Sequence, residues 1–201
     1  MIYFTTDDGI RLEGRFHGQK NGPAAVITHP HPLYGGDMDD YVVSAIEAVF
    51  RELDYTTLRF NFRGVGQSGG TYDEGNGEIQ DVLAAIQYLW DFGANRIELA
   101  GYSFGTWVNA RAAADTDAEI ARMIMVSPPV TMLTFPDTEI PELKLILTGA
   151  HDDYSPPDQL RKLIPKWNPN ALLEVIEGGD HFYGNAIPEL RSLLKKHLGR
   201  L

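Results

Sequence analysis

Residues 96–105 read RIELAGYSFG, and this stretch decides how the rest of the chain is interpreted. RIELAGY (96–102) is a short apolar run of the kind found in buried strands, and FGTWVNARAAA (104–114) is rich in good helix formers. Between them, Ser103 occupies a G-x-S-x-G pattern, which is typical of a nucleophile on a sharp strand-to-helix turn. The sequence therefore predicts a strand, a tight turn that carries Ser103, and a helix.

A second G-x-S-x-G pattern occurs at residues 66–70, GQSGG. Its Ser68 lies several residues beyond the predicted strand TTLRFNF (56–62), and GGTYDEGNG (69–77) cannot begin a helix promptly. A nucleophile needs the sharp turn between strand and helix to expose its oxygen. We therefore interpret Ser68 as a structural residue and Ser103 as the candidate nucleophile.

The remaining pattern alternates strands with helices. An Asp-Gly turn at residues 7–9 joins two alternating segments into a hairpin. The predicted strands are 2–6, 10–17, 24–29, 56–62, 96–102, 121–129, 144–153 and 171–178, and the predicted helices are 38–53, 79–93, 104–114, one near 155–163, and 186–198. This order predicts an α/β fold: a doubly wound, mostly parallel sheet with an N-terminal antiparallel hairpin. Residues 128–142 suffice only for a loop, so we expect one domain over 1–201 without a cap.

Charge and composition exclude several classes of function. Asp and Glu outnumber Lys and Arg by 28 to 17, which gives a net charge of -11 and disfavours nucleic acid as a partner. The chain has no cysteine, so disulfides, thiolate metal sites and a cysteine nucleophile are excluded. The N-terminal MIYFTTDDGIRLEG lacks the pattern of a signal peptide, and no segment is apolar enough to span a membrane. We expect a cytoplasmic protein with no membrane partner.

The partners of a serine nucleophile are expected later in the chain, an acid first and then a histidine. GAHDD (149–153) ends a predicted strand with Asp152 and Asp153, and GGDHF (178–182) ends the last one with His181. We prefer Asp152, because Asp153 stands next to YSPP, where it can shape the turn into a helix with Ser155 as N-cap and Pro156 as its first residue. The acid would fix the tautomer of His181 and stabilise its imidazolium form.

An oxyanion hole is expected to use the N–H of Phe104 and a second N–H from the loop THPHPLYGG (28–36). The two prolines of this loop have no N–H. Three donors remain, with the first preferred: His31, Leu33 and Tyr34. The two His-Pro pairs also suggest a metal site, but the chain has neither cysteine nor an H-E-x-x-H pattern, and we predict no metal.

Taken together, these motifs resemble the α/β-hydrolase superfamily over nearly the whole chain. HPHPLYGG (29–36) with RFNFRGVGQSGG (59–70) is similar to small, capless serine hydrolases of bacteria, related in plan to dienelactone hydrolases, whose cysteine nucleophile is absent here. The resemblance implies Ser103 as nucleophile, Asp152 as acid and His181 as base. It also implies that RGVGQS (63–68) is a structural loop. Many members have His-Gly where this chain has His29-Pro30, so the second oxyanion donor stays open.

The sequence therefore predicts a serine hydrolase that cleaves a carboxylic ester or thioester of a small or short-chain acyl group through an acyl-enzyme. It requires no cofactor, and its partner is a small-molecule substrate. Without a cap the site should be open, with aromatic walls: Tyr34, Tyr102, Phe104, Tyr154 and Phe182. An amidase or peptidase with the same triad, and a binding module without activity, are the alternatives. Nothing in the sequence indicates the substrate itself or the oligomeric state.

Overall fold

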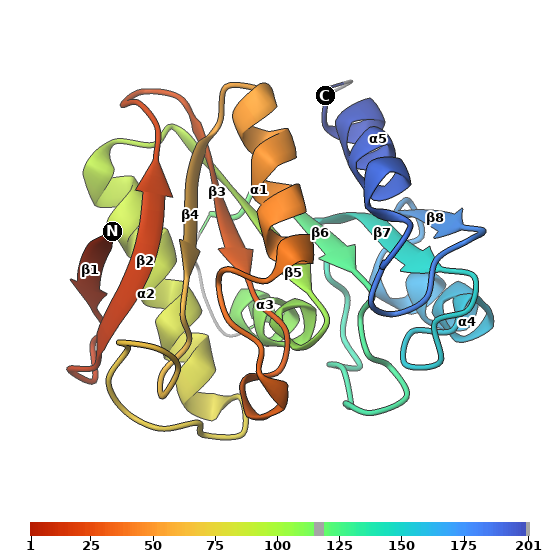
Figure 1. Ribbon diagram of the computed structural model, residues 1–201, viewed down its shortest axis with the longest axis horizontal. Helices are drawn as coiled ribbons and strands as arrows, with labels where there is room; N and C mark the ends of the chain where they lie inside the picture. Colours follow the sequence, from red (N-terminus) through yellow and green to blue (C-terminus); the bar gives the residue numbers. More distant parts are fainter. Residues whose placement is uncertain (115–118, 200–201) are drawn as a thin grey trace.

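A computed structural model describes residues 1–114 and 119–199 of the chain (Figure 1). Within them, one eight-stranded sheet has the order β1-β2-β4-β3-β5-β6-β7-β8. The strands are β1 (Ile2–Thr5), β2 (Arg11–His17), β3 (Pro23–Thr28), β4 (Thr56–Phe60), β5 (Arg96–Tyr102), β6 (Arg122–Val126), β7 (Leu143–Gly149) and β8 (Leu172–Ile176). The helices are a 3-10 turn η1 (Pro32–Tyr34), α1 (Tyr41–Glu52), α2 (Asn76–Phe92), α3 (Phe104–Ala114), α4 (Pro157–Trp167) and α5 (Ile187–Leu198).

The N-terminal hairpin forms where the Asp-Gly turn predicts it. β1 and β2 pair antiparallel, with Thr5 opposite Arg11, and the N–H of Gly9 donates to the carbonyl of Thr6. β2 then pairs antiparallel with β4, and every pair from β4 through β3 to β8 is parallel. Residues 127–142 between β6 and β7 contain no helix or strand. The predicted mostly parallel sheet with an antiparallel hairpin and no cap is confirmed.

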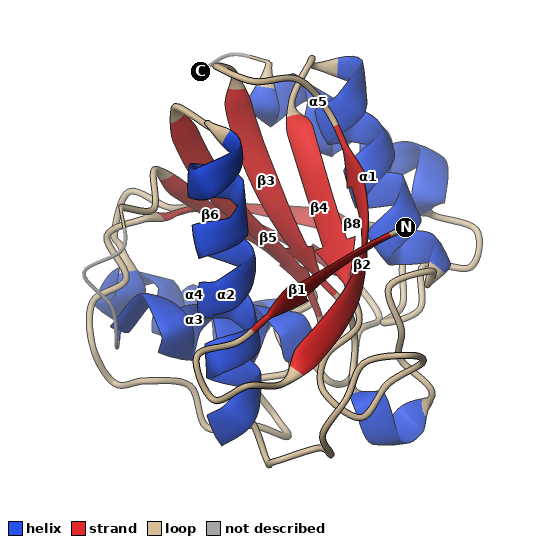
Figure 2. Cartoon of the chain, turned by 90° about the vertical axis from the view of Figure 1, so that its left-hand side faces the viewer, coloured by secondary structure: helices blue, strands red, loops and turns tan. Residues whose placement is uncertain are grey.

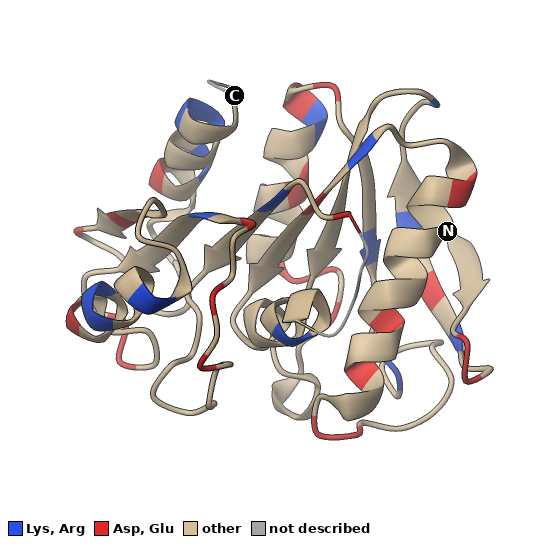
Figure 3. Cartoon of the chain, turned by 180° about the vertical axis from the view of Figure 1, so that it is seen from behind, with Lys and Arg blue, Asp and Glu red and all other residues tan. Residues whose placement is uncertain are grey.

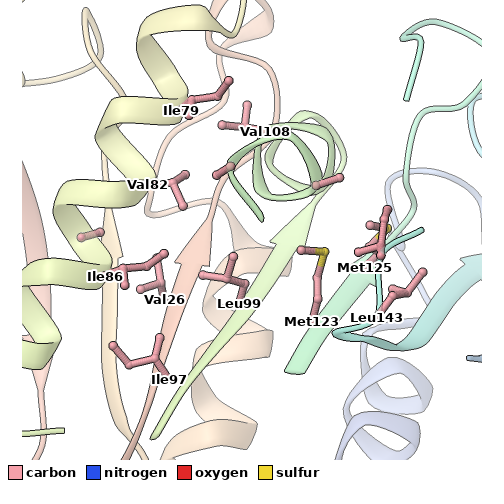
Figure 4. Packing of buried hydrophobic residues seen from close by; sticks show 14 of the residues in the cluster. Val26, Ile79, Val82, Ile86, Ile97, Leu99, Val108, Met123, Met125 and Leu143 are labelled. Atoms are coloured by element: carbon pink, nitrogen blue, oxygen red, sulfur yellow. The ribbon is translucent and has the colours of Figure 1, made fainter. Parts of the chain in front are cut away.

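Helices cover both faces of the sheet, as Figure 2 shows from the side. Successive side chains of a strand point to opposite faces, so Val26 of β3 joins the core beneath α2, α3 and α4, whereas Ala25 and Ile27 join the core beneath α1 and α5. Figure 4 shows the first core, where Ile79, Val82 and Ile86 of α2 pack on the strands. Burial on both faces explains why the central strands are continuous apolar runs in the sequence.

Two helices begin later than predicted. α1 begins at Tyr41 because Asp40 caps it, its carboxylate accepting from the N–H of Val42 at 2.8 Å and of Val43 at 3.3 Å. The prediction of Ser155 as N-cap is wrong: α4 begins at Pro157 and has no side-chain cap. The N–H of Ser155 donates instead to a carboxylate in the preceding loop, which the following section describes.

The loops after β3, β5, β7 and β8 follow the carboxyl ends of parallel strands, which share one edge of the sheet. In Figure 1, β3 reaches this edge at its lower end. In an open α/β sheet this edge is where ligands bind. The predicted triad residues Ser103, Asp152 and His181 and the predicted oxyanion donors lie in or beside these loops. None of the helices in the described ranges has the length and apolar character needed to cross a membrane.

Candidate active site

Ser103 lies on a sharp turn between β5 and α3, with a φ of 52°. Glycine is required at positions 101 and 105, because other parts of the backbone lie very close to these residues. A Cβ on Gly101 would lie 2.7 Å from the N of Thr106, and a Cβ on Gly105 would lie 2.7 Å from the carbonyl oxygen of Thr28. α3 therefore begins in direct contact with the end of β3. This close packing places Ser103 on a tight turn with a strained backbone conformation.

The structure brings Ser103, His181 and Asp152 together from three different loops. Ser103 Oγ lies 3.0 Å from His181 Nε2, and His181 Nδ1 lies 2.9 Å and 3.0 Å from the two oxygens of Asp152. Because a carboxylate only accepts hydrogen bonds, Nδ1 carries a proton and Nε2 of the neutral ring is free to accept from Ser103. All three side chains are at least nine-tenths buried.

The surroundings of Asp152 distinguish it from Asp153. Its Oδ1 accepts from the N–H of Tyr154 at 3.0 Å and of Ser155 at 2.8 Å, whereas Asp153 is exposed. Burial raises the pKa of Asp152, but the hydrogen bond and the charge of His181, together with the other hydrogen bonds to this carboxylate, hold the pKa below its ordinary value. The carboxylate that faces the histidine is thus kept ionised.

Ser68, in the second G-x-S-x-G pattern, has no free hydroxyl. Its Oγ donates to the carbonyl of Asn61 at 2.7 Å and accepts from the N–H of Glu13 at 3.0 Å. These bonds tie the loop after β4 to β2. A serine whose proton and lone pair are both engaged with buried backbone groups is a structural residue.

The predicted oxyanion donors differ in whether their N–H groups already donate a hydrogen bond within the protein. The N–H of Leu33 donates to His31 Nδ1 at 3.2 Å and that of Tyr34 to the carbonyl of His31 at 3.0 Å, so both are engaged. Within the described residues, the N–H of His31 and the N–H of Phe104 donate to no protein acceptor. The rings of His31 and Phe104 lie 4.7 Å apart, which places the loop against the start of α3.

The two histidines of this loop have separate structural roles. His29 is fully buried; its Nδ1 lies 2.7 Å from the carbonyl oxygen of Pro30, and its Nε2 accepts from the N–H of Phe62 at 3.0 Å. Burial lowers the pKa of His29 to about 4, so the ring is neutral. His31 packs on Tyr72, whose hydroxyl lies 3.3 Å from its Nε2, and burial also lowers its pKa. The sequence did not indicate the role of His29.

Comparisons with known proteins identify the family of the chain. No family model matches the chain. An uncharacterized protein of Rickettsia prowazekii is 33% identical over 98% of this chain and 88% of that protein. An alpha-beta serine hydrolase homologue from Coxiella burnetii is 34% identical, with a TM-score of 0.89 over 98% of this chain and 96% of that one. A serine hydrolase without lid from Xanthomonas campestris is 28% identical, with a TM-score of 0.88 over 99% and 93% of the two chains. The chain belongs to the α/β-hydrolase superfamily.

This membership confirms the resemblance inferred from the motifs, and it supports hydrolase activity in general terms. The walls of the site follow from the exposed side chains of this α/β-hydrolase. Large apolar side chains are exposed on the loops and short helical segments around the triad and at the start of α1: Leu33, Tyr34, Tyr41, Met132, Tyr154 and Phe182. The predicted walls Tyr34, Tyr154 and Phe182 are among them. Tyr102 and Phe104, which are also predicted as walls, are buried beneath the loops that they contact.

Tyrosine hydroxyls hold the histidine loop of this α/β-hydrolase in place. The hydroxyl of Tyr102 donates to the carbonyl of His181 at 2.9 Å, and the hydroxyl of Tyr41 donates to the carbonyl of Phe182. Tyr102 therefore links the turn that carries Ser103 to the loop that carries His181. Only the general rule that a buried tyrosine hydroxyl needs a partner could have suggested this contact from the sequence.

Proposed function

We propose that the protein is a serine hydrolase that cleaves a carboxylic ester of a small, uncharged acyl group by two-step acyl transfer. The single observation that carries this proposal is the hydrogen-bonded line from Ser103 Oγ through His181 to Asp152, with distances of 3.0 Å and 2.9 Å. A serine beside a correctly oriented imidazole is the arrangement that activates a hydroxyl as a nucleophile.

In the first step, Ser103 Oγ attacks the ester carbonyl carbon while His181 Nε2 takes the hydroxyl proton. Asp152 stabilises the imidazolium that forms. The tetrahedral intermediate then collapses, and His181 gives the proton to the leaving alcohol oxygen. In the second step, His181 takes a proton from water as the water attacks the acyl-enzyme. The bond between the acyl carbon and Ser103 Oγ then breaks, His181 returns the proton to Ser103 Oγ, and the carboxylic acid leaves.

The negative oxygen of each intermediate is assigned to the N–H groups of Phe104 and His31. Across residues 1–114 and 119–199 these N–H groups have no protein acceptor, and they lie on either side of the contact between α3 and the loop after β3. Each donor of this kind is worth roughly 2.7–4 kcal/mol of transition-state stabilisation. The N–H groups of Leu33 and Tyr34 are less suitable as oxyanion donors, because they already donate hydrogen bonds to His31.

The charges at the carboxyl edge favour an uncharged substrate. The loops that follow β3 through β8 contain a single basic residue, Arg63, which is buried and paired with Asp81 at 2.8 Å and Asp8 at 3.0 Å. The same loops carry many carboxylates, and Figure 3 shows acidic segments along the lower loops. The acidic residues are Asp37, Asp39, Asp40, Asp73, Glu74, Asp137, Glu139, Glu142, Asp152, Asp153, Glu177 and Asp180. A carboxylate or phosphate on the substrate would meet repulsion and find no free cation.

Labelling with a fluorophosphonate tests the chemistry. The folded protein should label and hydrolyse p-nitrophenyl esters, and both activities should disappear in Ser103→Ala and His181→Ala. Ser68→Ala is the matched control, and it should label like the parent. Labelling that persists in His181→Ala, or that disappears in Ser68→Ala while the protein stays folded, would contradict the assignment.

Substrate class is tested with matched esters. p-Nitrophenyl butyrate should react roughly tenfold faster, in kcat/KM, than the mono-p-nitrophenyl ester of succinate, and added salt should narrow the difference because it screens exposed charges. Activity should fall as the acyl chain grows. An amide matched to the butyrate ester distinguishes an esterase from an amidase, and the corresponding thioester shows whether sulfur leaving groups are accepted.

A further inference from the structure

A small cavity lies at the edge of the sheet opposite to the triad. It occupies about 210 Å³ between the amino-terminal ends of β6, β7 and β8 and the last turn of α5, which ends near the mark C in Figure 1. Its apolar walls are Ile124, Leu145, Leu172 and Leu198. Because a water molecule takes up roughly 30 Å³ in the liquid, the cavity has room for one small organic molecule.

The polar part of the cavity lining is basic. It consists of Arg122, Lys144 and His197, and the described lining residues include no Asp or Glu, although the chain has a net charge of -11. His197 is paired with Glu174. The ammonium group of Lys144 donates to the carbonyl of Pro141 at 2.6 Å, which leaves two of its three N–H donors for solvent or a ligand. The cavity therefore combines apolar walls with a positive side.

Arg122 is more than nine-tenths buried and has one nitrogen without an acceptor. Its Nε and Nη2 donate to Glu98 at 2.7 Å and 2.8 Å, and Nη2 also donates to the Tyr55 hydroxyl at 3.0 Å. Nη1 is buried and has no partner in the described part of the chain. Because Nε and Nη2 form the edge that meets Glu98 on β5, Nη1 lies away from β5, on the side of β7, β8 and the cavity.

The positive charge at this edge is not fully balanced. Glu98 is shared by two arginines, Arg122 at 2.7 Å and Arg96 at 3.3 Å, so one carboxylate cannot neutralise both. A buried charged donor without an acceptor is costly, and an anion in the cavity would supply the acceptor. A carboxylate is suited to this position, because its planar oxygens match a guanidinium group.

We propose that this cavity is a binding site for a small monocarboxylate with an apolar chain. The carboxylate lies against Arg122 and Lys144, and the chain lies among Leu145, Leu172 and Leu198. A second charged group on the ligand would enter the apolar walls without a partner, so dicarboxylates are excluded. The site shares no residue with the triad and does not depend on the proposed hydrolase function, although the acids released by that function belong to the same chemical class.

Titration of the ¹⁵N-labelled protein with hexanoate, followed by the NMR signals of backbone amides, tests the site. The amide signals of Ile124, Leu145 and Leu198 should shift and saturate. Hexan-1-ol keeps the chain without the charge and acetate keeps the charge without the chain, so each should bind at least roughly tenfold more weakly. Shifts confined to Phe104 and His181, or equal affinity for hexanoate and hexan-1-ol, would overturn the proposal.

Substitutions at exposed lining residues test the role of charge without disturbing the core. Leu172 is 52% exposed at the start of β8. Leu172→Glu should weaken hexanoate binding roughly fivefold by repulsion, whereas the matched Leu172→Gln should change it less than twofold. Lys144→Gln should weaken binding about two- to threefold, because its exposed charge is partly screened. Lys162→Gln, at an exposed lysine of α4, should have no effect.

Arg122→Lys tests the buried cation itself. It keeps a positive charge beside Glu98 but removes Nη1, so the folded variant should lose most of its affinity for hexanoate. If this variant does not fold, the Leu172 pair decides: equal affinity of Leu172→Glu and Leu172→Gln would show that the proposal is wrong. Ester hydrolysis should be unchanged in the Leu172 and Lys144 variants, and a parent protein without esterase activity would contradict the proposed function while leaving the binding measurement intact.

Discussion

His29 predicts a loss of stability in acid that can be calculated from its surroundings. The buried ring donates from Nδ1 to the Pro30 carbonyl and accepts at Nε2 from the Phe62 N–H. Protonation would place an N–H against the N–H of Phe62 and leave a charge on a fully buried ring. Burial accordingly holds the pKa of His29 at about 4, whereas an unfolded histidine titrates near 6.5.

The sign and the magnitude follow from linkage. Because the folded pKa lies below the unfolded one, the unfolded chain binds the proton first, and folding is penalised as pH falls from 6.5 to 4. A gap of about 2.5 units, at 1.36 kcal/mol for each unit, corresponds to roughly 3 kcal/mol of unfolding free energy. Stability is fully present above pH 6.5, and no further loss from His29 is expected below pH 4.

Urea unfolding, followed by tryptophan fluorescence from pH 7 to pH 4, measures this loss. His29→Gln removes the titrating group, so its free energy of unfolding should fall less steeply with acid than that of the parent, whatever its value at pH 7. Carboxylates that titrate in this range are common to both proteins and cancel in the difference. His17→Gln, at an exposed histidine, should retain the parent slope. Equal slopes for His29→Gln and the parent would refute the reasoning.

Three further predictions concern the site. Asp152→Asn should lower kcat by about 10⁴-fold, because the histidine loses the acceptor that fixes its tautomer, whereas Asp153→Asn should stay within threefold in the same ester assay. Gly105→Ala should lower the free energy of unfolding by more than about 2 kcal/mol, since its Cβ would meet the backbone at the end of β3, and Gly178→Ala, which has open space, should be neutral in urea unfolding. Tyr102→Phe should reduce kcat with little effect on KM, because the loop of the base loses an anchor.

The fold was largely predictable because each element follows from short-range rules. The bounds of β5 agree with the predicted residues, and the Asp-Gly turn at residues 7–9 forms the hairpin. Errors fall at the ends of elements. The strands predicted over 121–129 and 144–153 end in the structure at Val126 and Gly149, and helix starts differ from the prediction where a tertiary contact decides. The N–H of Ser155 donates to Asp152, and Ser155 does not cap α4. This arrangement depends on where the loop that carries Asp152 packs, and the residues of the helix do not determine it.

The sequence predicts which residues meet at the candidate site, but it does not predict the contacts that surround them. Strand ends and chain order bring Ser103, Asp152 and His181 to one edge, and the sequence contains both facts. Ser127 and Tyr183, whose hydroxyl oxygens lie 2.8 Å apart, come from segments 56 residues apart, and their contact depends on two loop conformations with positive φ. Neither residue belongs to a motif, and no local preference of serine or tyrosine favours that backbone, so a single sequence contains no signal for the pair.

The two G-x-S-x-G patterns show that what a serine can do is decided by the bonds its hydroxyl already makes. Ser68 gives its proton to one backbone carbonyl and accepts from one backbone N–H, both buried, so that proton abstraction would break the tie between β2 and the loop after β4. The hydroxyl of Ser103 has His181 as its hydrogen-bond partner within the described residues, and its own N–H donates to the carbonyl of Val126. Removing the proton from Ser103 therefore costs no structural bond, because within the described residues its hydroxyl oxygen has no backbone hydrogen-bond partner on the strained turn between Gly101 and Gly105.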